Sequence, residues 1–294
     1  MRTIAALALI LAGPACAAET ASFLDIGVGA RGLGMGGAYT ALADDAHSIY
    51  WNPAGLAALD KREIAASHAE LANSTRLDFI AYGHPTPLGV FAADATYLSQ
   101  GALEGRDALG HPTGNFQASD AEAGFGYGRK TEWADLGATV KFVQSHIASA
   151  QAQTVAADLG AHKTLGALSL GAALRNLGPG MKFGSETNDL PLRLALGAAY
   201  KFQGGHSVSA DLTNGPRGAG SDFGIGGEFK AVKNVFLRGG YTTKSSISGG
   251  TGFDAARGLT LGLGYRDGRW SLDYAAVPMG ELGSTHRFTL GARF

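Results

Sequence analysis

The feature that most constrains the fold is an alternation of apolar residues with small or charged ones, which recurs from about residue 62 to the C-terminus. Successive side chains of a β-strand point to opposite sides, so this period of two indicates strands with one apolar face. About fourteen strands are predicted on this basis. They lie near residues 62–71, 77–84, 87–98, 121–130, 132–147, 152–163, 166–176, 190–202, 206–214, 221–231, 233–243, 258–267, 269–277 and 286–294.

The lengths of these segments and of their connections predict a membrane barrel. Most segments are about 9–13 residues long, which suits tilted strands that cross a bilayer. Short connections such as 129–132 and 266–269 alternate, imperfectly, with longer ones such as 99–120 and 176–189. This alternation is typical of outer-membrane barrels. The expected fold is all-β: an antiparallel transmembrane barrel of about 14 strands in the outer membrane of a Gram-negative bacterium.

Aromatic residues gather at the strand ends that are predicted to face the periplasm, where their rings suit the membrane–water boundary. They are Tyr127, Trp133, Tyr200, Phe202, Phe229, Tyr265, Trp270 and Phe294. The last segment, "RFTLGARF", alternates and ends in phenylalanine, which is typical of the signal that barrel-assembly machinery recognises. Phe288, Leu290 and Phe294 are the expected signal residues. Barrel-assembly machinery and outer-membrane lipid are therefore expected partners.

The inward faces of the predicted strands carry charges of both signs. The residues expected there are Arg193, Lys201, Asp211, Glu228, Arg238, Arg266, Asp273, Arg287 and Arg293. Two interpretations stay open, namely ion pairs that fill the lumen and direct contact with a solute. The formal net charge of −1 leaves no basic excess for nucleic acid, so no such partner is expected. The 45 glycines suit a crowded, strongly curved sheet.

The first residues predict a secretory signal peptide over residues 1–17. A short apolar run follows Arg2, and Ala15-Cys16-Ala17 forms a cleavage site flanked by small residues. Cys16 is the only cysteine, and its lipid modification is the alternative. No other stretch approaches the length of a transmembrane helix. The exported chain is therefore expected either to be soluble in the periplasm or to form a barrel, and the strand pattern favours the barrel.

Gly32, Gly34 and Gly37 spell G-x-G-x-x-G, a pattern that can open a dinucleotide-binding loop. Such a loop also needs a βαβ unit and an acidic residue about twenty positions later. Asn52 occupies that later position, and no βαβ pattern follows. The glycines therefore predict close backbone packing instead of nucleotide binding.

No arrangement of residues points to catalysis, a metal or a cofactor. The eight histidines are scattered, and the sequence has neither H-E-x-x-H nor G-x-S-x-G. His68, His162 and Asp158 could meet across strands, as chance residues on any barrel wall can. The loop 245–258 resembles a calcium loop but lacks the spacing of acids that calcium requires. The protein is expected not to be an enzyme and to bind no metal or cofactor.

The segment "GLGMGGAYTALADDAHSIYWNPAGL" (32–56) resembles the N-terminal hatch of the FadL superfamily and is closest to its PorV/PorQ-type branch. The matching residues are Gly37, Ala41, Ala43, Asp44, Asp45, Ala46, Asn52, Pro53, Ala54 and Gly55. The segments 174–183, 190–200 and 272–294 also resemble this branch. The resemblance implies a fourteen-stranded barrel (61–294) whose N-terminal segment (18–60) folds inside as a plug.

Physical chemistry allows this plug. Pro53 restricts Asn52 to extended backbone, and the Asn52 side chain can cap the turn Asn52-Pro53-Ala54-Gly55. Asp44 and Asp45 are expected to hold the plug against lumen bases. Because an unpaired buried carboxylate is costly, at least one of them is expected to have an arginine or lysine partner.

Two functions are compatible with these features. The first is a non-enzymatic PorV/PorQ-type component of an envelope or protein-export assembly, as in type IX-like secretion, with export-machine proteins as partners. The alternative is a FadL-like passive channel whose partner is a hydrophobic small molecule. Because the long loops are polar, with few apolar residues to capture such a molecule, the sequence favours the first function.

Overall fold

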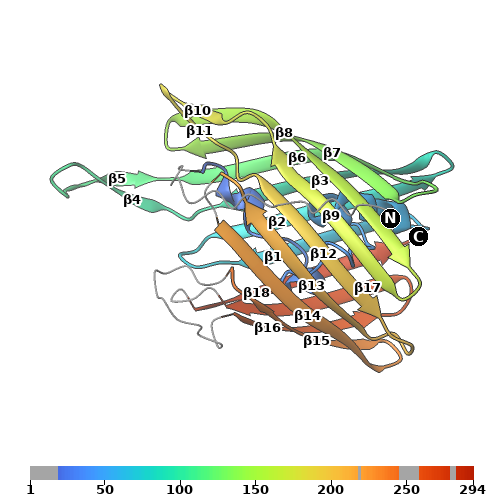
Figure 1. The fold of residues 1–294 in the computed structure, drawn as a ribbon. Coiled ribbons are helices and arrows are strands. Elements are labelled where there is room, and N and C mark those ends of the chain that lie inside the picture. The colour runs from blue at the N-terminus through green and yellow to red at the C-terminus, as the bar shows by residue number, and fades with distance from the viewer. Residues whose placement is uncertain (1–18, 218–219, 245–257, 279–282) are drawn as a thin grey trace.

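The computed structural model describes residues 19–217, 220–244, 258–278 and 283–294, and most of them form one closed antiparallel barrel (Figure 1). The expected fourteen strands are confirmed within these residues. They are β1 (Glu63–Glu70), β2 (Arg76–Thr86), β3 (Gly89–Ser99), β6 (Ala118–Lys130), β7 (Asp135–Ile147), β8 (Ala150–Leu165), β9 (Leu168–Leu177), β12 (Arg193–Lys201), β13 (Ser207–Gly215), β14 (Gly220–Val232), β15 (Val235–Thr242), β16 (Leu259–Arg266), β17 (Trp270–Pro278) and β18 (Ser284–Arg293).

The barrel strands follow one another around the wall in chain order, and β1 closes the ring by pairing with β18. The closing register places Glu63 opposite Arg293 and Glu70 opposite His286. The backbone N–H of Phe294 donates to the Arg62 carbonyl at 3.0 Å. The two ends of the barrel segment therefore meet at one rim, and the barrel sheet has no open edge strand.

Two of the long connections contain hairpins, which the sequence analysis took for irregular loops. Between β3 and β6 lie β4 (Leu103–Arg106) and β5 (Pro112–Phe116), and between β9 and β12 lie β10 (Met181–Phe183) and β11 (Glu186–Asn188). The β4–β5 hairpin projects well beyond the barrel (Figure 1). Its turn is closed by the Asp107 carboxylate, which accepts N–H groups of Leu109 and His111 at 2.9 Å.

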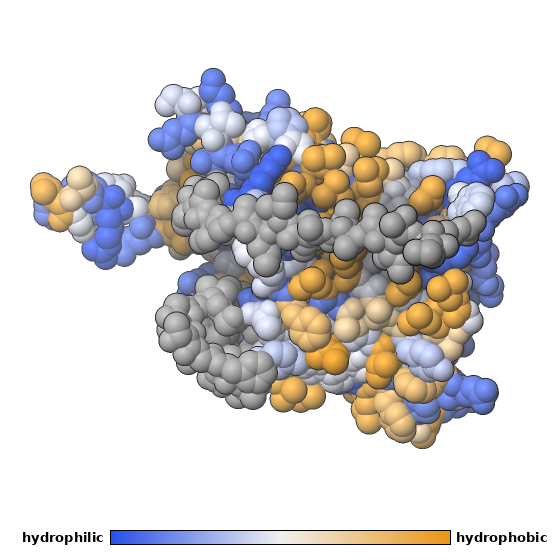
Figure 2. All heavy atoms as spheres, viewed as in Figure 1, coloured by the Kyte–Doolittle hydropathy of each residue, from blue (hydrophilic) through white to orange (hydrophobic). Residues whose placement is uncertain are grey.

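The alternation of apolar and small residues sorts side chains between the outer surface and the lumen, as predicted. In β16, Leu261 is 57% exposed whereas Thr260 is fully buried. Figure 2 shows hydrophobic residues gathered over the wall and many hydrophilic ones toward the ends of the barrel. None of the helices in the described part of the chain is long and apolar enough to cross a membrane.

Leu261→Arg is expected to lower the free energy of unfolding by about 2–4 kcal/mol, because a charged side chain would then face the centre of the bilayer. Urea titration of the protein folded into lipid vesicles measures this loss. Gln151→Arg is the matched control, since Gln151 is exposed at the outer end of β8 and the cost near the interface is about 0–1 kcal/mol. Equal losses at both positions would contradict a lipid-facing Leu261.

Most of the chain between residues 21 and 57 is buried inside the barrel, where it forms four short helices (Figure 1). They are η1 (Ser22–Asp25), α1 (Ala30–Leu33), α2 (Ser48–Trp51) and η2 (Pro53–Ala58). Gly36 lies against the wall so closely that a Cβ atom would come within 2.5 Å of the Tyr241 carbonyl oxygen. Its φ of +68° also favours glycine. We call residues 19–60 the hatch.

Candidate functional site

The turn at Asn52 joins the hatch to the barrel wall. Asn52 is extended, with φ −162° and ψ 102°, and its Oδ1 accepts the Ala54 N–H at 3.2 Å. Its Nδ2 donates to the carbonyl oxygens of Thr40 (2.8 Å) and Ala161 (3.2 Å), the latter on β8. Glycine at wall position 137 makes room for this turn, because a Cβ there would come within 2.2 Å of Pro53. One buried amide therefore caps η2 and ties it to the wall.

Asp44 and Asp45 both lie in ion pairs, but only Asp44 has a partner on the barrel wall. Asp44 contacts the Arg31 guanidinium at 2.6 Å and the Lys201 ammonium at 3.0 Å. Asp45 accepts the Tyr39 hydroxyl at 2.7 Å and lies 3.4 Å from the His47 ring. The expectation that at least one of the two carboxylates has an arginine or lysine partner is confirmed. Only Asp44 meets a lumen base, so the expectation that Asp45 also does so is wrong. The hatch itself supplies the partners of Asp45.

The environment of Asp45 keeps its carboxylate charged. Burial by itself would raise the pKa of Asp45, but the hydrogen bond and charge of His47, together with Arg31, hold that pKa far below its usual range. His47 responds in the opposite sense, because Asp45 raises its pKa despite burial. Each of the two groups therefore favours the charged form of the other.

Arg31, which sequence reasoning missed, connects the hatch to a chain of charges on the wall. Its guanidinium donates to Glu228 at 3.0 Å, and Glu228 also accepts from Arg238 at 2.7 Å. Arg238 continues to Asp273 at 2.7 Å. All four side chains are at least nine-tenths buried. Arg31 lies in a glycine-rich part of the sequence, where only its charge could have indicated this role.

A second set of ion pairs holds the start of the hatch. Arg193 lies 2.9 Å from Glu19 and 3.0 Å from Asp25, and Lys244 lies 2.7 Å from Asp25. Burial would raise the pKa of Asp25, but Lys244 and Arg193 outweigh burial and lower it. Arg193 belongs to β12 and Lys244 follows β15, so these ion pairs tie the start of the hatch to the wall at two places.

The remaining lumen charges from the sequence analysis also point inward. The Asp211 carboxylate accepts the backbone N–H groups of Tyr39 and Thr40 at 2.9 and 2.7 Å. Arg293 pairs with Glu63 at 2.9 Å, and the Arg266 guanidinium lies 5.2 Å from the centre of the Phe236 ring. Most of these charges therefore contact the hatch or one another. This arrangement agrees with the interpretation in which ion pairs fill the lumen.

A cavity of about 350 Å³ lies between the hatch and the wall. Apolar and charged side chains share its surface. Its apolar lining includes Ile26, Leu33, Tyr50, Trp51, Phe223 and Val277. Its charged lining consists of Glu19, Asp25, Arg175, Arg193, Asp211, Asp222, Lys244 and Arg287. A cavity of this volume falls at the lower end of the range of about 300–1,000 Å³ that is typical of small-molecule sites.

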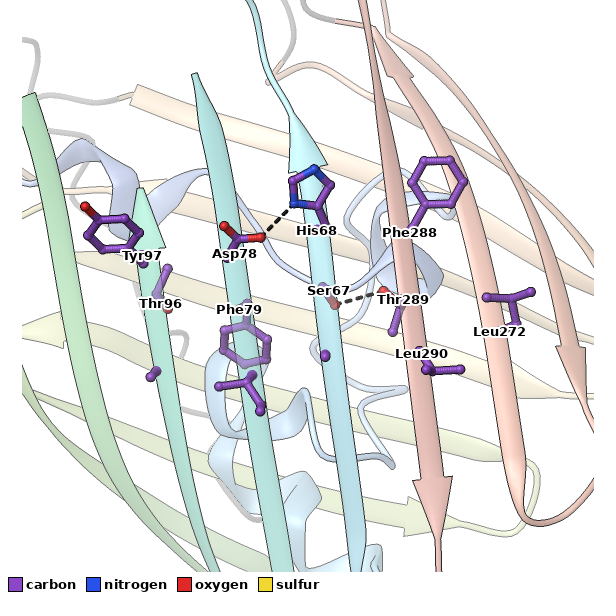
Figure 3. Close-up of a pocket in the computed structure, with 13 residues that line it drawn as sticks. Ser67, His68, Asp78, Phe79, Thr96, Tyr97, Leu272, Phe288, Thr289 and Leu290 are labelled. Carbon is purple, nitrogen blue, oxygen red and sulfur yellow. Dashed lines mark hydrogen bonds and ion pairs between the residues drawn. The ribbon is translucent and has the colours of Figure 1, made fainter. Parts of the chain in front are cut away.

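A groove of about 450 Å³ runs across the wall over the neighbouring strands β3, β2, β1, β18 and β17 (Figure 3). Ala66 leaves a depression that is bordered by Ile80, Tyr97, Leu272, Phe288 and Leu290. The inward-facing residues behind it include Phe79, Ser67 and Thr289, and the hydroxyls of the last two lie 2.8 Å apart (Figure 3). At one side His68 and Asp78 form an ion pair of 2.7 Å.

The groove and the cavity are separated by a void of about 10 Å³. This void shares Gly27 and Arg287 with the cavity and shares Ser67, His68 and Phe79 with the groove. A space needs roughly 10–15 Å³ to hold one water molecule. The wall is therefore thin at β1 but closed.

The three residues that the sequence analysis considered for a chance meeting across strands lie apart in the structure. His68, His162 and Asp158 do not meet: His68 pairs with Asp78, His162 lies 3.3 Å from Asp135, and Asp158 pairs with Lys141. The described residues contain no group of three or more potential metal ligands. The calcium-like loop lies outside them, except for Gly258, as do the signal peptide and Cys16.

One serine, histidine and aspartate do line up, at Ser67, His47 and Asp45. The His47 Nε2 atom lies 3.0 Å from the Ser67 Oγ atom. However, His47 is 5% exposed and stacks on Phe79, and the adjoining void would hold no more than one water molecule. This row of residues therefore ties the hatch to β1 and leaves no room for a substrate.

Comparison with known proteins shows what the barrel is similar to. A family model described as "Uncharacterised protein family (UPF0164)" matches residues 14–100, and a search of curated proteins found no match. The toluene transporter TbuX of Ralstonia pickettii is similar with a TM-score of 0.68 and 15% identity, over 91% of this chain and 98% of that one.

Two further structures are similar over nearly their whole lengths. The P. putida toluene transporter TodX has a TM-score of 0.60 and 13% identity, over 91% of this chain and 99% of that one. A FadL homologue of Pseudomonas aeruginosa has a TM-score of 0.58 and 13% identity, over 91% and 98%. The chain therefore shares the barrel fold of these three proteins.

Proposed function

We propose that the protein is a FadL-like passive channel for hydrophobic small molecules in the outer membrane. One observation carries this proposal, namely that the lumenal cavity, the void and the wall groove adjoin one another through shared residues. The fold common to two toluene transporters and a FadL homologue supports it. This function is the alternative from the sequence analysis, which had favoured a secretion component.

The route that we propose runs sideways through the wall. A molecule in the cavity would reach the groove by displacing Ser67 and Phe79, because their side chains border the void. The hydrogen bonds of Ser67 to His47 and Thr289 close this route at rest. The hatch meanwhile fills the lumen, so water and ions have no straight path. Lateral delivery would release an apolar molecule into the membrane, where it is most soluble.

We also propose the cellular context that the sequence indicates. The signal peptide would be removed on export, and the barrel-assembly machinery would recognise the last strand. Phe288, Leu290 and Phe294 are 50%, 53% and 58% exposed, so the machinery could reach them. A PorV/PorQ-type role in protein export is the second candidate, favoured by the projecting β4–β5 hairpin (Figure 1), which offers a surface to a partner protein.

Uptake of labelled toluene by Gram-negative cells that express the protein tests the channel. We expect uptake several-fold above that of cells with empty vector, and no rise in uptake of labelled glucose, because the hatch excludes hydrophilic solutes. Ala66→Trp should return toluene uptake toward the vector level, since the indole would fill the groove. Ala198→Trp is the matched control, because Ala198 is also exposed on the wall but lies on β12.

Three outcomes would contradict the proposal. Toluene uptake no higher than that of cells with empty vector would contradict the channel function. A parallel rise in glucose uptake would indicate an open pore. Equal losses in the two tryptophan variants would show that the groove is not the exit. Heat-dependent mobility on gels verifies that each variant has folded into a barrel.

A further inference from the structure

The end of the barrel that carries the short turns has an excess of positive charge, although the whole chain has a formal net charge of −1. This end lies opposite the β4–β5 hairpin (Figure 1). Its exposed acids are Asp60, Glu132 and Asp267. The exposed bases at this end that form no ion pair within the described residues are Lys61, Arg62, Arg129, Lys130, Lys233 and Arg269.

The opposite end of the barrel differs, because exposed arginines there lie beside acids. Arg76 lies 4.0 Å from Glu70, and Arg106 lies 2.9 Å from Glu104. The unneutralised positive charge is therefore a property of the short-turn end. In outer-membrane barrels the short turns face the periplasm.

Three bases at the short-turn end gather around one tryptophan. Trp133 lies in the turn between β6 and β7 and is 83% exposed. Arg129 and Lys130 are the last two residues of β6, directly before this turn. Lys163 of β8 reaches the turn from the other side, since its Nζ atom donates to the Glu132 carbonyl at 3.5 Å. We call Arg129, Lys130, Trp133 and Lys163 the rim cluster.

Two of the bases in the rim cluster lie on the outer face of the wall. Because side-chain direction alternates along a strand, Arg129 shares the face of Phe125, which is 60% exposed. Lys163 likewise shares the face of Leu159, which is 50% exposed. Within the described residues, no carboxylate lies at ion-pair distance from either base, and Glu132 of the same turn pairs with neither. Their positive charges therefore stay available where the wall leaves the bilayer.

The surroundings of the rim cluster favour a lipid as its partner. Phospholipid headgroups lie beside the wall at this level, and the exposed side chains of Leu136 and Leu165 continue the apolar surface up to the cluster. An indole ring suits the membrane–water boundary, and basic side chains near it attract anionic lipid. A soluble acidic protein would meet the tip of the turn, whereas Arg129 and Lys163 face sideways.

We propose that the rim cluster binds the headgroup of an anionic phospholipid, such as phosphatidylglycerol, in the leaflet that faces the periplasm. The lipid phosphate accepts hydrogen bonds from the bases of the cluster, and the acyl chains lie along Phe125, Leu136 and Leu159. Each base near an anionic lipid surface strengthens binding about fivefold. This surface is separate from the lumenal cavity, so the inference goes beyond the proposed channel function and does not depend on it.

Native mass spectrometry of the detergent-solubilised full-length protein measures this binding. Separate samples are titrated with phosphatidylglycerol and with phosphatidylcholine that has the same acyl chains. We expect phosphatidylglycerol to bind about tenfold tighter or more, because only this lipid has a net negative charge. Added salt should weaken the binding of phosphatidylglycerol and leave that of phosphatidylcholine unchanged, because salt screens exposed charges.

A variant that combines Arg129→Gln, Lys130→Gln and Lys163→Gln should bind phosphatidylglycerol no better than phosphatidylcholine. A second variant that combines Arg129→Lys, Lys130→Arg and Lys163→Arg keeps the three charges and should keep the preference. Heat-dependent mobility on gels verifies that each variant has folded. The salt dependence of the parent protein tests the same charges without any substitution.

The matched control combines Arg76→Gln, Arg106→Gln and Lys182→Gln. These three bases are exposed at the opposite end of the barrel, so the control loses the same net charge and should keep the preference.

Three outcomes would overturn the lipid site. Equal binding of the two lipids to the parent protein would leave a soluble acidic partner as the occupant of the rim cluster. Equal losses in the glutamine variant and the control would show a response to net charge alone. A preference that survives in the glutamine variant would place the lipid elsewhere on the wall. Toluene uptake tests the channel function separately from all three.

Discussion

Deletion of residues 20–58 is expected to turn a sealed barrel into a conducting one, with a rise in single-channel conductance on the order of tenfold. These residues include the four helices that fill the lumen. The wall does not depend on them for closure, because β1 and β18 pair directly over eight residue positions. Planar bilayer recording of the deletion variant measures the conductance, after heat-dependent mobility has verified that the barrel has formed.

Replacing the β4–β5 hairpin, residues 104–115, with a short glycine–serine linker is the control for this experiment. This hairpin projects beyond the barrel and supplies none of the residues around the lumenal cavity (Figure 1). Its loss should leave conductance near that of the intact protein. If the deletion variant folds and its conductance is as low as that of the intact protein, the hatch is not what blocks the lumen.

Glu228→Ala is expected to lower the free energy of unfolding by about 3–5 kcal/mol, because it leaves buried cations uncompensated. Glu228 accepts from Arg31 of the hatch and from Arg238 of β15, and it is 5% exposed. Its loss should also weaken the hold on the hatch, so brief conducting events should appear. Urea titration in lipid vesicles and bilayer recording measure the two effects.

Glu132→Ala is the matched control, because Glu132 is exposed in the turn between β6 and β7. Its side chain has no ion pair within the described residues, so its removal should change stability by no more than about 0.5 kcal/mol. A cost for Glu228→Ala as small as that of the control would mean that the Arg31–Glu228–Arg238 chain contributes little to the fold.

The sequence by itself determined the barrel and the side of the wall on which each residue lies. Leu261 faces outward and Gly262 inward because side-chain direction alternates with a period of two, which is a local property of the backbone. The strand number follows from counting these periods. The cap at Asn52 was also predictable, because the restriction from Pro53 and the reach of the asparagine side chain act over only a few residues.

Only the tertiary structure decided how the hatch is held and where space remains. Arg31 and Glu228 are separated by 197 residues, and no local pattern specifies that they meet. Asp45 found its partners within the hatch because the fold turned His47 and Arg31 toward it. The cavity, with Arg175 and Arg287 on its surface, is what the hatch leaves unfilled. The size and shape of such a space depend on how two surfaces from distant parts of the chain pack together. Local patterns in the sequence do not specify this packing.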